Sequence, residues 1–194
     1  MASKQLTKPQ FQKYLRELSH TALVASENYE IWWIYKNKED RPKYIDVMSE
    51  YWGFFRASIP AHFIAMLMAL SKIYENRNDT MNIYRFLYLI GNGKLIDDTV
   101  IKEVNESLEA KKSLIKKICI LRSNYFAHIS EKLNYDEVLK KANIKYKHFK
   151  ELIELAQGLL SKISYAYNKG DVLTTGFAKE DTYRLMNTLL KKNT

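Results

Sequence analysis

The stretch TVIKEVNESLEAKKSLIKKICILRSNYFAHISEK, residues 99–132, decides the fold class of this chain. It is basic and polar early, and it then becomes apolar at four consecutive positions, Ile118 to Leu121. A helix that is apolar on every side has to be covered on every side. We therefore expect residues 99–132 to form a helix inside a helical bundle. One face would pack against helices of its own chain, and the other could pack against a second copy.

The rest of the sequence also favours helices. It has six Gly and three Pro among 194 residues, and alternating β-branched patterns are few. Thr7-Lys8-Pro9-Gln10 is typical of a helix start, with a capping box and an early proline. The expected helices run from Thr7 to a break at 37–42, through Met48–Ile73, from a cap at Asn78-Asp79-Thr80 to Gly91-Asn92-Gly93, over 99–132, from Asn134 to about Tyr167, and over 177–192. The sequence thus predicts an all-α bundle of about five or six helices.

Length and composition indicate one domain. We expect a single helical domain over residues 1–194, with its core at about 8–167 and a C-terminal helix at about 177–192, because no repeat, low-complexity tract or linker divides the chain. The single cysteine, Cys119, excludes an internal disulfide and a thiolate-rich metal site. Residues 1–5 contain no apolar targeting segment, and the longest apolar run, Ile59–Leu70, is shorter than the ~20 residues of a membrane span. We expect a cytoplasmic protein with no membrane partner.

Two motifs suggest metal or phosphate sites, and both are weak. Glu17-Leu18-Ser19-His20 has the Glu-x-x-His spacing of di-iron bundles, but such sites need two copies and two further Glu, and one copy occurs here. His20 is then a surface or packing residue. Gly91-Asn92-Gly93-Lys94 lacks the strand and the spacing of a phosphate loop. No metal and no cofactor are expected.

Aromatic and basic residues each allow two interpretations. The aromatic groups could stack bases, but their helical spacing favours core packing; they are Tyr29, Trp32 and Trp33, and Tyr51, Trp52, Phe54 and Phe55. Lys and Arg number 31 against 22 Asp and Glu, and the net charge is +9. Lysines concentrate at 111–112, 116–117 and 140–150. Such a surface either binds RNA or DNA or keeps the chain solvated.

A further motif is Arg122-Ser123-Asn124-Tyr125-Phe126-Ala127-His128, an Arg and a His separated by five residues after a strongly apolar helix. It resembles the signature of the HEPN superfamily, a group of helical-bundle proteins whose catalytic members are metal-independent endoribonucleases. Ser71-Lys72-Ile73-Tyr74 and the segment 79–84 resemble the abortive-infection (AbiU-like) branch. The resemblance covers about Phe11 to Leu160. It implies a HEPN-like bundle with an antiparallel four-helix core, and a role in phage defence or as the toxin of a toxin–antitoxin pair.

The resemblance also implies site residues. Arg122 and His128 would carry the catalysis: Arg122 stabilises the phosphorane, and His128 transfers a proton, because its ordinary pKa near ~6.5 leaves both forms populated. Asn124 would orient a phosphate or the imidazole. RNA contacts would come from the neighbouring polar, aromatic and basic residues Ser123, Tyr125, Lys116 and Lys117, with a core role equally open for Tyr125. The partners would be an RNA substrate and an antitoxin or another defence protein.

A second copy would complete such a site. One His128 cannot act as acid and base at the same instant. Six positions on an unbroken helix also mean about 240° of rotation and about 9 Å of rise, so Arg122 and His128 would not share a face. A twofold dimer would supply two imidazoles and two guanidinium groups around one phosphate.

Two other functions stay open. Ser123 stands where active relatives carry Asn, Asp or His, which favours a catalytically inactive module that binds RNA, nucleotide or a partner. A helical scaffold unrelated to nucleic acid would have Arg122 and His128 buried and ion-paired. The spacing itself has low specificity, because Arg56 and His62 repeat it. In HEPN toxins silenced by nucleotidyltransferase partners, a Tyr two positions after the His is modified; Ser130 stands there, so we expect no such modification.

Overall fold

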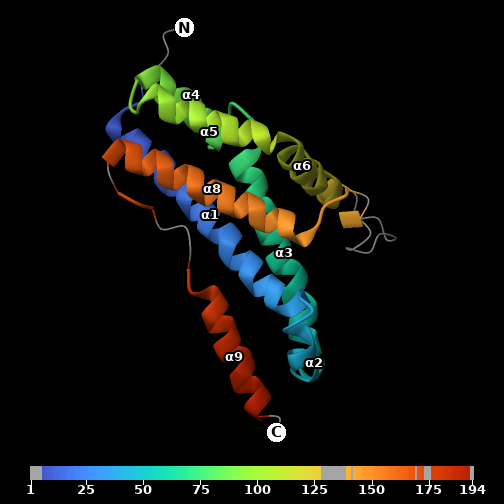
Figure 1. Ribbon diagram of the computed structural model, residues 1–194. Helices are drawn as coiled ribbons and strands as arrows, with labels where there is room; N and C mark the ends of the chain where they lie inside the picture. Colours follow the sequence, from blue (N-terminus) through green and yellow to red (C-terminus); the bar gives the residue numbers. More distant parts are fainter. Residues whose placement is uncertain (1–5, 128–138, 141, 169, 173–175, 193–194) are drawn as a thin grey trace.

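The computed structural model describes residues 6–127, 139–140, 142–168, 170–172 and 176–192, and this part of the chain is helical without strands. The fold class is therefore the expected all-α bundle (Figure 1). Eight helices lie in the described residues: α1 (Lys8–Lys36), α2 (Arg41–Glu50), α3 (Trp52–Tyr74), α4 (Ile83–Gly93), α5 (Asp98–Ala110), α6 (Lys112–Ala127), α8 (Tyr146–Asn168) and α9 (Ala178–Lys192). The number exceeds six because two of the expected long helices are interrupted.

α1 begins where its sequence predicts. Thr7 is the N-cap, its backbone N–H donates to Gln10 Oε1 at 2.9 Å, and its side chain accepts from the Gln10 N–H, which completes the capping box. The helix ends at Asn37, whose amide donates to the Trp33 carbonyl oxygen at 2.9 Å. Both ends of this helix are thus set by local sequence.

The expected helix through Met48–Ile73 is broken at Tyr51, which separates α2 from α3. Tyr51 has φ −98° and ψ 38°, outside the helical range, and the poor helix former Gly53 follows closely. The break exposes the side chains at the start of α3: Trp52 is 62% and Phe54 59% exposed. The expected core role is therefore wrong for Trp52 and Phe54, and also for Tyr51, which is exposed as well; it is correct for Tyr29, Trp32 and Phe55, and Trp33 is partly buried against the core.

The cap of α4 also differs from the expectation. The N-cap is Asn82, not the segment 78–80. Its buried side chain accepts from the Arg85 N–H at 2.9 Å and donates to the Arg77 carbonyl oxygen at 2.7 Å, so it fixes the loop before α4 as well as the helix start. The helix ends after Gly93, with Lys94 in the left-handed conformation (φ 48°).

The single helix expected over 99–132 is divided at Lys111 into α5 and α6, and its last residues, 128–132, lie outside the described part of the chain. Ile118 and Leu121 are buried in the core, whereas Ile120 is 46% exposed. The described residues therefore leave one side of this apolar segment, at Ile120, uncovered. The helical stretch expected from Asn134 lies partly outside the described residues, and its described helix α8 begins at Tyr146, after Asn143 with φ 50°.

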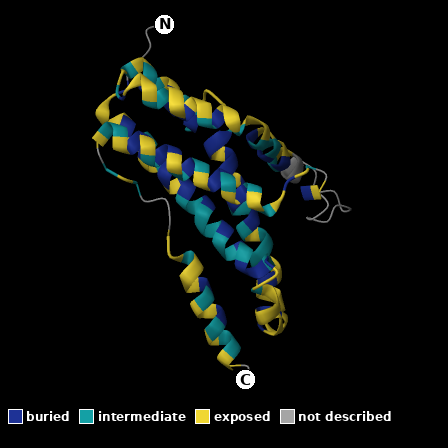
Figure 2. Cartoon of the chain, viewed as in Figure 1, coloured by how far each residue is buried: buried dark blue, intermediate teal, exposed yellow. Residues whose placement is uncertain are grey.

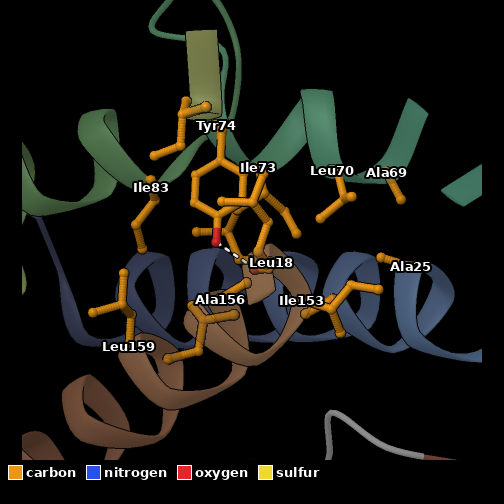
Figure 3. Close-up of a cluster of buried hydrophobic side chains, with 14 of the residues drawn as sticks. Leu18, Ala25, Ala69, Leu70, Ile73, Tyr74, Ile83, Ile153, Ala156 and Leu159 are labelled. Atoms are coloured by element: carbon orange, nitrogen blue, oxygen red, sulfur yellow. Dashed lines mark hydrogen bonds between the residues drawn. The ribbon is translucent and has the colours of Figure 1, made fainter. Parts of the chain in front are cut away.

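The core lies between α1, α3 and α8, with α4, α5 and α6 packed against it (Figures 1 and 2). Trp32, Phe63 and Phe149 are fully buried, and the rings of Phe63 and Phe149 meet edge-on with centroids 5.5 Å apart. Tyr74, near the end of α3, donates its hydroxyl to the Leu152 carbonyl oxygen of α8 at 2.6 Å (Figure 3). This bond fixes the end of α3 against α8.

The expected C-terminal helix is α9, and it packs on α1 and α2 through a separate cluster. Met186 is buried there among Ile34, Tyr44 and Phe55. Two tyrosine hydroxyls secure it: Tyr44 donates to Asn187 Oδ1 at 2.9 Å and Tyr183 donates to Asp40 Oδ2 at 2.8 Å.

α3 is the one helix in the described residues that is long and apolar enough to match a membrane span by length and composition. Phe63, Leu67 and Leu70 of this helix are fully buried in the bundle. A core helix satisfies the same criterion, so the match is weak evidence of insertion.

Candidate active site

Arg122 lies in α6 and reaches the end of α3. Its guanidinium donates to Glu75 Oε2 at 2.6 Å, and the two side chains are 28% and 32% exposed. The Arg122 Nε is buried and has no hydrogen-bond partner within the described residues. The guanidinium is thus held at one end while part of its donor capacity remains unused.

A cavity of about 610 Å³ opens beside this ion pair. Three segments contribute to its walls in addition to α6. The lining residues are His20, Thr21 and Val24 of α1, Ala65, Met68, Ala69 and Lys72 of α3, Glu75, Arg77 and Thr80 of the loop that follows, and Arg122. Its volume falls within the ~300–1,000 Å³ of small-ligand sites.

The charges in this cavity favour an anion. Lys72, Arg77 and Arg122 carry three positive charges against the single carboxylate of Glu75. Arg77 is engaged with Asp79 through two hydrogen bonds of 3.0 and 2.7 Å, which lower the pKa of that carboxyl. Lys72 is exposed and makes no ion pair with another described residue. Arg122 and Lys72 are therefore the cations best placed to meet a phosphate.

The local sequence explains the position of Lys72 and Glu75. Both lie in the last turn of α3 or at its C-cap, where Ile73 and the hydrogen-bonded Tyr74 face the core. Because Ile73 and Tyr74 face the core, Lys72 lies on the solvent-exposed side of the helix. Glu75 ends the helix with its N–H bonded to the Ser71 carbonyl oxygen, and its side chain reaches α6.

The other expected site residues lie outside this cavity or outside the description. Ser123 is exposed, and its hydroxyl donates to the Cys119 carbonyl oxygen at 3.1 Å, within its own helix. Lys116 is exposed, and Lys117 is close enough to His148 to contribute to the lowered pKa of that ring, which burial mainly causes. Asn124 and Tyr125 belong to α6, but their side chains are not among those described; His128 lies outside the described residues.

The second Arg–His pair has different surroundings. Arg56 is exposed and makes no hydrogen bond with a described residue. His62 is half-buried between α1 and α3, where its Nδ1 is 2.8 Å from Asn28 Oδ1. Burial lowers the pKa of this imidazole. His62 is thus the hydrogen-bonded packing histidine that its place in α3 predicts.

Metal and thiol chemistry find no support in the described side chains. They contain no group of three or more His, Cys, Asp or Glu able to hold a metal ion. Cys119 is a free thiol whose pKa is raised, mainly by burial. A raised pKa lowers the thiolate fraction and makes a nucleophilic role less favourable.

Glu75, Arg77 and Thr80 line the cavity, and the sequence did not single them out as site residues. Lys72 and His20, which the sequence analysis did not assign to the Arg122 site, line the same cavity. Glu75 is 47 residues from Arg122, and no local pattern joins them. The available signal was a pair of charged residues at the end of an apolar run: Lys72 and Glu75 come shortly after the apolar residues 63–70.

Comparison with known proteins agrees with this architecture. Residues 8–186 match the family model of the HEPN domain AbiU2. No curated protein and no solved structure matches the chain significantly. Because the match spans most of the sequence, and includes both α3 and the Arg122 segment, the chain belongs to the AbiU2 family of HEPN proteins.

Proposed function

We propose that this protein is a metal-independent endoribonuclease that acts in the cytoplasm as an abortive-infection effector or toxin. Its membership in a HEPN abortive-infection family supports this role. The observation that carries the proposal is the position of Arg122: its guanidinium borders an open cationic cavity instead of being sealed in the core. A scaffold role would predict a fully buried ion pair there.

Cleavage of RNA requires groups that Arg122 and His128 can supply. The 2′-oxygen attacks the adjacent phosphorus, the bond from phosphorus to the 5′-oxygen breaks, and the products carry a 2′,3′-cyclic phosphate and a 5′-hydroxyl. A base takes the proton of the 2′-hydroxyl, and an acid gives one to the 5′-oxygen. Histidine fits both tasks near neutral pH, and arginine stabilises the negative charge of the phosphorane. Asn124 orients the phosphate or the imidazole, while Ser123, Tyr125, Lys116 and Lys117 contact the RNA.

The active form in this proposal is a homodimer. One chain supplies a single His128, and a twofold mate supplies another. Ile120 on the outer side of α6, 46% exposed, provides apolar surface next to the Arg122 turn. Ile120→Glu should dissociate such a dimer and abolish cleavage, whereas Leu185→Glu on α9 removes an equally exposed apolar residue and should do neither. Analytical ultracentrifugation measures the first effect, and persistence of a dimer in Ile120→Glu would exclude this face.

The test of the nuclease function is RNA cleavage in EDTA. The wild type should release fragments that end in a 2′,3′-cyclic phosphate, and His128→Ala should cut about 10²–10⁴-fold more slowly, because one proton transfer is lost. Wild-type protein that releases no fragments, or equal activity of His128→Ala, contradicts the proposal. An antitoxin, if one exists, should suppress the same activity.

A second candidate is a catalytically inactive module that binds RNA, a nucleotide or a partner protein. Ser123 favours it, as does the carboxylate of Glu75, which already occupies one end of the Arg122 guanidinium. Salt-sensitive RNA binding without any cleavage product would select this function over the nuclease.

A further inference from the structure

We propose that His20 is a second proton-transfer residue of the Arg122 cavity and that Lys72, beside it, holds the scissile phosphate. The inference rests on the proposed nuclease function and adds two residues from outside the Arg122–His128 segment. It adds an imidazole from α1 to the two copies of His128 that the proposed dimer supplies.

α1 and α3 pack in opposite directions (Figure 1), and His20 of α1 and Lys72 of α3 both line the cavity. Asn28 of α1 contacts His62 of α3. Counting back eight residues on α1 and forward eight on α3 gives about 12 Å along each axis, which places residue 20 level with about residue 70. Lys72 is half a turn beyond that level, and Arg122 borders the same cavity.

The cavity has a polar and an apolar end. On α1, His20 lies one turn from Val24, and on α3, Lys72 lies one turn from Met68, which is exposed. Because the helices run in opposite directions, the two polar residues share one end and the two apolar residues the other. A phosphate at the polar end would leave its base over Val24 and Met68. The ligand that fits both ends is a nucleoside phosphate, either as part of an RNA strand or as a free nucleotide.

His20 is distinguished from the other described histidines by its free ring nitrogens. His62 is hydrogen-bonded to Asn28, and the Nδ1 of His148 accepts from the Lys145 N–H at 3.0 Å. His20 is exposed at the cavity wall and makes no hydrogen bond or ion pair within the described residues. Both of its nitrogens are available to a ligand.

The proton balance of cleavage assigns His20 its task. One imidazole accepts the 2′-hydroxyl proton as the 2′-oxygen bonds to phosphorus. Another donates a proton to the 5′-oxygen as its bond to phosphorus breaks. His20 performs one of these transfers, and no oxidant, reductant or metal ion enters the balance. Lys72 and Arg122 meet the phosphate oxygens, where charge accumulates in the transition state.

The experiment separates proton transfer from binding. Cleavage of a labelled single-stranded RNA is measured for the wild type, His20→Ala and, as the matched control, His148→Gln. Binding is measured with the same sequence fully 2′-O-methylated, which cannot be cut, and adenosine monophosphate serves as a competitor to test for a free nucleotide. Thermal unfolding verifies that each variant is folded.

His20→Ala should lower kcat by about 10²–10⁴-fold, remove one limb of the pH–rate profile, and change affinity for the methylated RNA less than about two-fold. Lys72→Ala should weaken binding and reduce the salt slope by about 0.7, the value for one phosphate of a single strand, whereas Lys102→Ala on α5 should do neither. Competition by adenosine monophosphate below millimolar concentration would indicate a free-nucleotide site; its absence would indicate a site for RNA.

The outcomes distinguish this inference from the proposed function. A wild type that does not cleave RNA removes the nuclease function and the proton role of His20 together. A wild type that cleaves, with His20→Ala equally active, overturns the role of His20 alone and assigns the second transfer to the other copy in the dimer. Equal salt slopes for Lys72→Ala and Lys102→Ala overturn the phosphate contact.

Discussion

The chain contains the same Arg–x5–His spacing twice, at Arg56–His62 and at Arg122–His128, and the two segments have different surroundings. The first lies wholly within α3, where six residues turn the two side chains about 240° apart. Arg56 is exposed without a described partner, and His62 is hydrogen-bonded in the seam between α1 and α3. The Arg122 guanidinium instead meets Glu75 and borders a cavity with two further cations.

The spacing alone therefore does not determine what surrounds each arginine. What differs is the set of side chains that other elements bring to each arginine. Arg122 lies where α6 crosses the end of α3, so α1, α3 and the following loop all contribute side chains. Arg56 lies near the start of α3, beside the exposed Trp52 and Phe54.

The largest expected effect is on cleavage. Arg122→Ala should lower the rate of RNA cleavage by about 10²–10³-fold, because a donor that stabilises transition-state charge is lost. Arg56→Ala, which removes the same charge from the matching position, should stay within about two-fold of the wild type. Initial rates on one labelled RNA in EDTA measure both. Equal losses in the two variants would mean that only net charge matters.

Removing the partner of Arg122 should have the next largest effect. Glu75→Gln should tighten RNA binding about five-fold, since about 1 kcal/mol of repulsion between carboxylate and phosphate disappears. Cleavage should slow, because Arg122 is no longer held in position. Glu151→Gln is the control: Glu151 pairs with Lys111 at 3.2 Å and is similarly exposed, but it lies on α8 away from the cavity. Weaker RNA binding by Glu75→Gln would contradict the competition between carboxylate and phosphate.

The core beneath the cavity provides a test of stability. Tyr74→Phe removes a buried hydroxyl bonded to the Leu152 carbonyl oxygen, and should cost about 1–2 kcal/mol and about 3–6 °C in Tm. Tyr88→Phe removes an exposed hydroxyl and should leave Tm unchanged. Differential scanning calorimetry gives both values. RNA binding at 25 °C should be unaffected by either, and a loss confined to Tyr74→Phe would show that the cavity depends on this bond.

The smallest expected effect concerns the pH dependence of stability. Burial lowers the pKa of His62 in the folded chain, so the unfolded chain binds more protons below its ordinary pKa near ~6.5. Stability from this residue is complete above that value and is lost as the pH falls toward the folded-state pKa. His62→Gln should therefore flatten the decline in free energy of unfolding between about pH 7 and 5, without changing RNA cleavage. Parallel urea titrations that show the same decline in both proteins would contradict this.

Local signals predicted much of the fold. The capping box of Thr7 and Gln10 correctly located the start of α1, and the segment Gly91–Gly93 correctly ended α4. The break at Tyr51 was missed because the apolar period continues across it. Asn82 and the segment 78–80 offer competing caps within five residues, and burial of the Asn82 amide decides between them. That information exists only in the tertiary structure.

The site was less predictable than the fold. Spacing and family resemblance pointed to Arg122, but the same spacing included Arg56. Glu75, Lys72 and His20 reach the cavity from two other helices, at separations for which the sequence has no periodic signal. We expected the apolar segment of α6 to be covered on every side. Ile118 and Leu121 are buried in the core, but Ile120 is exposed. Which side of α6 is covered depends on the place where α3 crosses it.

In the proposed function, RNA binds at the Arg122 cavity. The most direct test is photo-crosslinking of a 4-thiouridine-substituted, fully 2′-modified RNA, followed by mass spectrometry of the linked peptides. Cross-links should concentrate on the end of α3 around Met68 and Lys72 and on the α1 segment that contains His20. Cross-links confined to Trp52, Phe54 and the Arg56 turn would place RNA at the opposite end of α3 and contradict the account.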